Sequence, residues 1–179
     1  SFTRKDEKYE TIVQHVIEER IRGNKVILVS QFRDTVMYYA DKLLKENELN
    51  RNDIGVVTGN LDDNRIGNAV HNKREILNRF SPKSKNQIEL LASQEINILV
   101  GTDTISTGQN LQDATVLMNL DLPYNPMQLE QRIGRIDRPR EGNQVEEIEI
   151  YTFPTYSAIE SILKMTQRLG EKMKGIYED

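Results

Sequence analysis

The stretch INILVGTDTISTG, residues 96–108, joins a short apolar run to a loop of glycines and small hydroxyl residues. The run over 96–100 is rich in β-branched side chains, as are strands that are buried on both faces of a sheet. Four other runs share this length and composition, so the sequence predicts five strands. The other four runs cover residues 26–29, 54–57, 116–120 and 148–153.

Segments with apolar residues at three- and four-residue spacing lie between and around these runs. This spacing is typical of amphipathic helices. Helices interleaved with strands predict an α/β fold in three layers, in which helices flank both faces of a parallel sheet. We expect one domain over residues 1–179, with its core at about residues 6–155. The predicted helices span residues 9–22, 35–48, 64–80, 86–93, 126–134 and 157–176.

The composition excludes several classes of protein and site. The 179 residues carry a net charge of −4 at pH 7, which excludes a uniformly basic nucleic-acid coat but allows a local basic groove. The chain has no cysteine and two histidines, which excludes disulfides and argues against a zinc site. No apolar run approaches the ~20 residues that span a bilayer, and no signal-peptide core is present. We therefore expect no membrane partner and a cytoplasmic location.

Arginine is concentrated in one short segment. No Lys or Arg occurs between Lys85 and Arg132, and then four arginines arrive within nine residues with no lysine among them. A guanidinium keeps its charge and can bind phosphate or carboxylate oxygens through two parallel hydrogen bonds. The segment indicates recognition of an anion, although a solvated loop with ordinary salt bridges fits the spacing equally well. The four arginines are Arg132, Arg135, Arg138 and Arg140.

The residues before these arginines predict a helix that presents two of them. Asn125 is a favourable N-cap, and Pro126 suits the first position of a helix. Gly134 marks the end of the predicted helix. Arg135 and Arg138 would then emerge from a helix terminus that the preceding strand holds rigidly, as a fixed cation for a ligand outside the domain.

Polar loops follow four of the predicted strands. In open α/β sheets, ligands bind beyond the carboxyl ends of the strands. The residues there are largely glycines, small hydroxyls and amides, which let a phosphate backbone approach and donate hydrogen bonds to it. Each loop alone is also an ordinary turn composition, but the four together favour a binding edge. They are SQF at 30–32, TGN at 58–60, GTDT at 101–104 and DLPY at 121–124.

The usual signatures of a nucleotide-binding lobe are absent from the sequence. Residues 101–108, GTDTISTG, lack the Gly-Lys-Ser/Thr ending of a Walker A element. The chain also contains neither a GxGxxG fingerprint nor an acidic cluster that would hold Mg²⁺. We therefore expect no metal-binding residues in this chain.

Three segments occur in order along the chain: VILVSQF at residues 26–32, VGTDTISTGQNL at 100–111 and EQRIGRIDR at 130–138. Together they resemble motifs IV, V and VI of superfamily 2 helicases of the Swi/Snf type. The stretch NLDLPYNP at 119–126 is similar to the segment that leads into motif VI in bacterial members. The resemblance covers about residues 6–155 and implies the second RecA-like domain, of P-loop NTPase-like fold, of a two-lobed ATPase.

The resemblance implies roles for individual residues. The arginines of motif VI, here Arg135 and Arg138, would be the catalytic residues that reach across to ATP on the other lobe. Gly108, Asn110 and Gln131 match positions near the nucleotide and are expected to bind ATP. The positions that match the nucleic-acid track are Ser30, Gln31, Thr58, Gly59, Thr102 and Asp103.

The resemblance also implies partners. ATP and Mg²⁺ would be held mainly by an N-terminal RecA-like lobe that this chain lacks, and the nucleic acid would be double-stranded DNA. We expect the C-terminal lobe of an ATP-dependent helicase or DNA translocase, inactive as an ATPase on its own. Two alternatives are a non-catalytic nucleic-acid-binding module of the same RecA-like fold and a small-molecule α/β enzyme, for which no acid, base or nucleophile constellation is visible.

Overall fold

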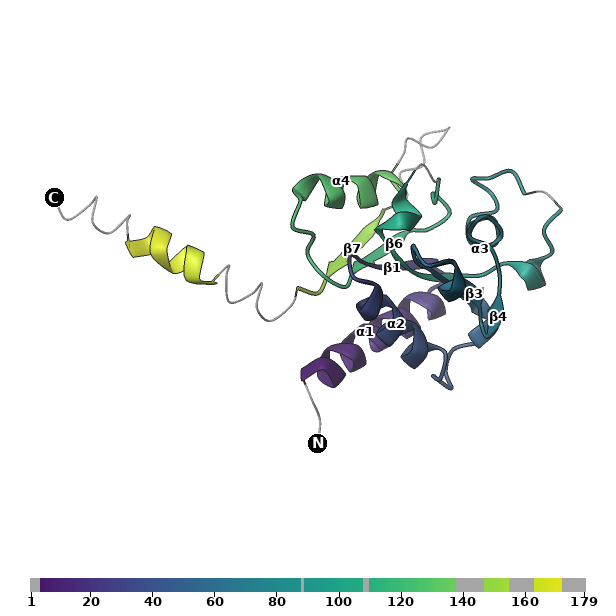
Figure 1. The fold of residues 1–179 in the computed structure, drawn as a ribbon, viewed down its shortest axis with the longest axis horizontal. Coiled ribbons are helices and arrows are strands. Elements are labelled where there is room, and N and C mark those ends of the chain that lie inside the picture. The colour runs from purple at the N-terminus through teal and green to yellow at the C-terminus, as the bar shows by residue number, and fades with distance from the viewer. Residues whose placement is uncertain (1–3, 88, 108–109, 138–146, 155–162, 172–179) are drawn as a thin grey trace.

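A computed structural model describes residues 4–171 of this chain, apart from residues 88, 108–109, 138–146 and 155–162. Within the described residues, a seven-stranded sheet in the order β4-β3-β2-β5-β1-β6-β7 forms the centre of the fold (Figure 1). Five strands are parallel and confirm the five predicted ones, whereas β3 is antiparallel to β2 and β4. The strands are β1 (Val26–Ser30), β2 (Ile54–Val57), β3 (Arg65–Ile66), β4 (Ala69–Val70), β5 (Ile98–Thr102), β6 (Val116–Asn119) and β7 (Glu149–Thr152).

Helices cover both faces of the sheet and confirm the predicted three layers (Figure 1). Leu28 of β1 packs with α1 and α2, whereas its neighbour Ile27 packs with α3 on the opposite face. The strand is a continuous apolar run because both of its faces are buried. The α-helices are α1 (Arg4–Ile21), α2 (Arg33–Leu43), α3 (Lys73–Phe80) and α4 (Pro126–Gly134), and short 3-10 turns are η1 (Arg51–Asp53), η2 (Leu61–Asp63), η3 (Ala92–Gln94) and η4 (Asp103–Ser106).

The prediction of one helix over residues 64–80 is wrong in its first half. β3 and β4 form a hairpin there, and Gly67 takes a φ of +58° at the turn. The side chain of Asn64 accepts a hydrogen bond from the backbone N of Thr58 at 3.0 Å, which holds the hairpin against the end of β2. Asn72 then caps α3 by accepting a backbone N–H of its first turn at 2.8 Å, so the helix begins only after the hairpin.

The predicted helix over residues 86–93 is also wrong. In the described part of this segment, the only helical turn belongs to Ala92–Gln94. Asn86 adopts a φ of +54°. A left-handed residue does not continue a right-handed helix, so the chain turns away at this point.

The last predicted helix, over residues 157–176, is described in part. Residues 163–171 are helical and exposed, which agrees with the prediction over that range. The rest of the predicted helix lies outside the described residues. The extent of the domain over residues 1–179 therefore stays a prediction.

Candidate functional site

The carboxyl ends of the parallel strands meet at one edge of the sheet. β1 and β5 pair in register, with Ser30 beside Thr102. β2 and β5 pair with Val57 beside Gly101, and β6 lies on the other side of β1. The polar loops that follow these strands are therefore neighbours, as the α/β topology predicts.

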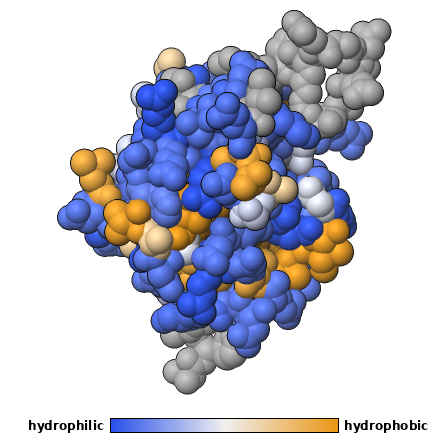
Figure 2. All heavy atoms as spheres, turned by 90° about the vertical axis from the view of Figure 1, so that its right-hand side faces the viewer, coloured by the Kyte–Doolittle hydropathy of each residue, from blue (hydrophilic) through white to orange (hydrophobic). Residues whose placement is uncertain are grey.

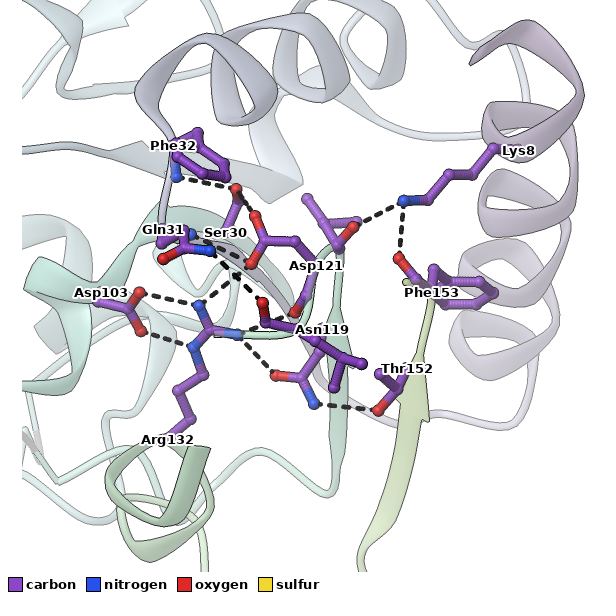
Figure 3. A network of polar contacts seen from close by, with 12 residues as sticks. Lys8, Ser30, Gln31, Phe32, Asp103, Asn119, Asp121, Arg132, Thr152 and Phe153 are labelled. Atoms are coloured by element: carbon purple, nitrogen blue, oxygen red, sulfur yellow. Dashed lines mark hydrogen bonds and ion pairs between the residues drawn. The ribbon is translucent and has the colours of Figure 1, made fainter. Parts of the chain in front are cut away.

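A buried arginine of α4 joins two of these loops (Figure 3). The side chain of Arg132 is 0% exposed, and its Nε and Nη2 donate to the two carboxylate oxygens of Asp103 at 2.5 and 2.8 Å. Nη1 donates to Oδ1 of Asn119 at 3.1 Å, and Nη2 lies 3.5 Å from Oδ1 of Asp121. Because a buried charge needs paired partners, this one side chain fixes α4 to the ends of β5 and β6.

Asp121 extends this network to the end of β1 (Figure 3). Its Oδ2 accepts a short hydrogen bond from the hydroxyl of Ser30, and its Oδ1 accepts the backbone N–H of Gln31 at 3.4 Å. The hydroxyl of Ser30 in turn accepts the backbone N–H of Phe32 at 3.0 Å. The loops after β1, β5 and β6 are thus linked to α4 by one continuous polar network.

Lys8 of α1, on the other face of the sheet, contacts the same edge. Its Nζ donates to the carbonyl oxygens of Leu120 and Phe153, at 2.7 Å each (Figure 3). Burial lowers the pKa of the Lys8 ammonium, against the opposing effect of the Asp121 charge. Lys8 therefore ties α1 to the ends of β6 and β7 rather than offering a free cation.

α4 ends at a second arginine that lies outside this network. Asn125 caps the helix by accepting a first-turn N–H at 3.0 Å, and Pro126 is its first residue, as predicted. Arg135 is the C-cap and is half-buried, and its guanidinium has no hydrogen-bond or ion-pair partner among the described residues. Gln131, one turn earlier, is exposed on the same side of the helix. Arg138 lies outside the described residues.

The segment of motif V returns to the end of α4. The backbone N of Leu111 donates to the carbonyl oxygen of Arg135 at 3.1 Å. Asn110 is therefore next to Arg135, although the two are far apart in sequence. Its Oδ1 accepts the backbone N–H of Gln112 at 3.1 Å, and its side chain is half-buried. The structure thus brings together three predicted nucleotide-site residues, Asn110, Gln131 and Arg135, whereas Gly108 lies outside the described residues.

The six residues predicted to line the nucleic-acid track all lie at the carboxyl edge, but most of their side chains bond inward. Ser30 is buried on Asp121, and Asp103 is paired with Arg132. The hydroxyl of Thr102 shares a hydrogen bond of 2.9 Å with that of Thr104. Thr58 is buried as well. The accessible members are Gly59, which is exposed, and Gln31, which is half-buried. Nε2 of Gln31 lies 3.4 Å from the carbonyl oxygen of Leu122.

Thr58 belongs to a second polar cluster, which holds the loop after β2. Its hydroxyl lies 2.6 Å from Oδ2 of Asp63. The guanidinium of Arg33, at the start of α2, binds both carboxylate oxygens of Asp63 at 2.6 and 2.7 Å. Chiefly because of this hydrogen-bonded pair, the pKa of the Asp63 carboxyl is lowered in the folded chain.

The lowered pKa of Asp63 makes its contribution to stability depend on pH. The contribution is fully present above the unfolded pKa of about 3.9 and is lost as the pH falls through the lower folded value. Asp63→Asn is therefore expected to reduce the free energy of unfolding at pH 7, with a difference from the parent that shrinks below about pH 4. Urea denaturation of both proteins at pH 7 and near pH 3 measures this, and an equal difference at both pH values would contradict it.

Two features of the edge were not predicted from the sequence. One is the role of Arg132 as the buried partner of Asp103 and Asp121, for which the only signal was its place in an arginine-only segment. The other is an aromatic pair, in which the rings of Phe32 and Tyr124 meet edge to face with centroids 6.4 Å apart. Both rings are accessible, at 44% and 87% exposure, because they follow β1 and β6 at the rim of the sheet.

The described residues place limits on metal binding at this edge. No group of three or more His, Cys, Asp or Glu among them could hold a metal ion. Two carboxylates at this edge are already bonded within the domain: Asp103 is paired with Arg132, and Asp121 accepts a hydrogen bond from Ser30. The described part of the chain therefore contains no cluster of metal ligands at this edge. Likewise, none of its helices has the length and apolar character needed to cross a membrane.

Comparison with known sequences finds relatives among helicases. The family described as helicase conserved C-terminal domain matches residues 7–140. The uncharacterized ATP-dependent helicase YqhH of Bacillus subtilis is 38% identical over 104 residues, which are 56% of this chain and 18% of that protein. The RNA polymerase-associated protein RapA of Pectobacterium atrosepticum is 39% identical over 70 residues, or 38% of this chain and 7% of that protein. The chain thus spans less than a fifth of the length of these curated relatives.

Two solved structures share the fold. The C-terminal part of the Fun30 ATPase domain has a TM-score of 0.55 at 17% sequence identity, covering 80% of this chain and 40% of that chain. The DUF1998 helicase MrfA, bound to DNA and AMPPNP, has a TM-score of 0.59 at 14% identity, covering 90% of this chain and 20% of that chain. At these identities the likeness is one of architecture, and it agrees with the three-layer sheet described above.

Proposed function

The chain belongs to the family of helicase conserved C-terminal domains, and on that premise we propose that it is the second RecA-like lobe of an ATP-dependent DNA translocase of the Swi/Snf type. The observation that carries this proposal is the state of Arg135. Its guanidinium lies at the end of a rigidly anchored helix and has no partner among the described residues. Such a cation is placed to bind an anion that another part of the protein supplies.

The chemistry of phosphoryl transfer fits this arrangement. Negative charge is spread over the γ-phosphate oxygens in the transition state, and a fixed guanidinium stabilises it. Arg132 cannot be this catalytic arginine, because its guanidinium is paired with Asp103 inside the domain. Arg135 is free to reach ATP, with Asn110 and Gln131 beside it to contact the nucleotide, and Arg138 is proposed as a second such arginine.

ATP and Mg²⁺ are proposed to be held mainly by an N-terminal lobe. The described residues of this chain contain no group of three or more His, Cys, Asp or Glu that could hold a metal ion, and the sequence has no Walker A element. Hydrolysis would then require the two lobes to close, because the nucleotide and the arginine lie on different lobes. Repeated closing and opening would move the carboxyl edge stepwise along the nucleic acid.

The nucleic acid is proposed to lie along the carboxyl edge, with double-stranded DNA as the substrate. Three groups are accessible at this edge: the amide side chains of Gln31 and Asn60 and the backbone of Gly59. These groups suit hydrogen bonds to phosphate and sugar, which position a protein on DNA without reading its sequence. We therefore expect binding with little sequence preference.

Gly59→Glu tests this track without disturbing the fold. A Cβ at this position would meet only Cγ2 of Thr104 at an ordinary 3.7 Å, so a side chain fits. A carboxylate about 4 Å from a phosphate costs about 1 kcal/mol in water, so duplex DNA should bind roughly fivefold more weakly. Fluorescence anisotropy at fixed salt measures the affinity, with Gly59→Ala as the control that should bind as the parent does. Equal affinity of Gly59→Glu and the parent would remove Gly59 from the track.

The proposed function itself is tested by nucleic-acid-stimulated ATP hydrolysis. The complete protein that carries this chain would be assayed with single-stranded DNA, duplex DNA and RNA at one ionic strength. Duplex DNA should stimulate turnover most strongly. DNA binding without any ATP turnover would instead favour the non-catalytic module, and stimulation by RNA alone would overturn DNA as the substrate.

A further inference from the structure

We infer that Lys73 and Arg74 form a phosphate-binding surface that extends the path of double-stranded DNA from the carboxyl edge over the start of α3. This α3 basic surface rests on the proposed function, because it presumes that DNA lies along that edge. It adds residues that the sequence motifs do not include.

Among the described residues, the loops that follow β1, β2, β5 and β6 offer DNA no unpaired cation of their own. No Lys or Arg occurs in residues 86–131, the segment that supplies the loops after β5 and β6. At the remaining loops, Arg33 is paired with both carboxylate oxygens of Asp63. Neutralisation of phosphates by Lys and Arg supplies most of the sequence-independent affinity for DNA. A lobe that binds DNA at this edge therefore needs cations from an adjoining element.

α3 provides cations next to the edge. Nζ of Lys73 donates to the carbonyl oxygen of Thr104 at 2.6 Å, and Thr104 is in the turn that follows β5. Cγ2 of Thr104 lies 3.7 Å from the place where a Cβ on Gly59 would stand. The side chain of Lys73 is thus continuous with the loops after β5 and β2. A duplex seated on those loops would have its next phosphates within reach of α3.

The positive charge of this surface is not neutralised by the described residues around it. Neither Lys73 nor Arg74 forms an ion pair among them, and Arg74 is exposed. The nearby carboxylate of Glu75 is 3.8 Å from Arg79 and from His71 instead. Figure 2 faces the side of the molecule that carries α3 and shows a largely hydrophilic surface with separate hydrophobic patches.

Lys73 and Arg74 are adjacent residues at the start of α3, so their positive charges lie close together and repel one another. A polyanion laid across them would relieve this repulsion, and continuity with the carboxyl edge favours DNA over an acidic protein as that polyanion.

The salt dependence of DNA binding tests this inference. For duplex DNA, the slope of log K against log salt changes by about 0.9 for each phosphate contact. In the complete protein, Arg74→Gln should reduce the slope by about 1, and the further change Lys73→Gln by about 1 more. Lys45→Gln is the matched control, since Lys45 is also exposed but follows α2 on the way to the opposite edge of the sheet. It should leave the slope unchanged.

The outcomes separate this inference from the function on which it rests. If the parent protein does not bind duplex DNA, both fail. If the parent binds and the variants keep its slope and its thermal midpoint, the α3 basic surface is overturned while the proposed function stands. Poly-glutamate that binds the parent through these residues, with DNA binding unchanged in the variants, would also overturn it in favour of an acidic partner.

Discussion

Replacing Arg135 by alanine is expected to lower ATP turnover of the complete protein by about 10³- to 10⁵-fold, while ATP still binds. The loss corresponds to about 4–7 kcal/mol of transition-state stabilisation at ~1.4 kcal/mol per tenfold change. The substitution should leave the fold intact, because Arg135 makes no ion pair or side-chain hydrogen bond with the described part of its own domain. Its removal therefore leaves no carboxylate uncompensated there, and the effect should fall on catalysis.

Steady-state turnover and equilibrium binding of an ATP analogue measure the two effects separately. Arg135→Lys keeps the positive charge but not the planar fork, so it should recover only part of the rate. Arg51→Ala is the control, because Arg51 is an exposed arginine that lies before β2, at the opposite edge of the sheet. Turnover of Arg135→Ala within a fewfold of the parent would show that this residue is not the catalytic arginine.

Replacing Arg132 by methionine is expected to lower the free energy of unfolding by about 3–5 kcal/mol. The guanidinium is fully buried, and the substitution leaves the carboxylate of Asp103 without its bidentate partner. Asp121 would also lose a positive neighbour at 3.5 Å. Because these groups hold α4 against the sheet, the same substitution should also reduce ATP turnover by displacing Arg135.

Chemical denaturation measures the stability of this variant, and a second substitution identifies the cause. Asp103→Asn in the Arg132→Met background removes the uncompensated charge and should restore part of the lost stability. A similar substitution at Arg79, which is bonded at the surface to the carbonyl of Gln94, should cost much less. A loss below about 1 kcal/mol for Arg132→Met would mean that the buried network does not hold the site together.

The sheet could be predicted from the sequence because four of its five parallel strands, β1, β2, β5 and β6, are buried on both faces, whereas β7 at the edge is partly exposed. Residues such as Ile27 and Leu28 are adjacent and both apolar only when helices cover both sides. The hairpin of β3 and β4 could not be predicted in this way. Ile66 and Val70 are spaced as they would be in a helix. The hairpin forms instead because Gly67 adopts a left-handed φ and because Asn64 is hydrogen-bonded to Thr58.

The candidate site could be predicted as a location but not in its internal bonding. The arginine-only segment and the loops after the strands indicated the carboxyl edge of the sheet, and the fold brings these segments together there. Which arginine is buried depends on Asp103 and Asp121, which follow β5 and β6 and meet Arg132 only in the folded chain. For the same reason Ser30 and Thr58, whose hydroxyls suggested contacts with nucleic acid, bond to buried carboxylates instead.

The most direct test is a structure of the complete protein with a non-hydrolysable ATP analogue and duplex DNA. We expect the guanidinium of Arg135 to lie within about 2.7–2.9 Å of a γ-phosphate oxygen, with the nucleotide held mainly by the other lobe. A closed complex in which Arg135 binds within its own domain or points to solvent, while other groups surround the γ-phosphate, would contradict it.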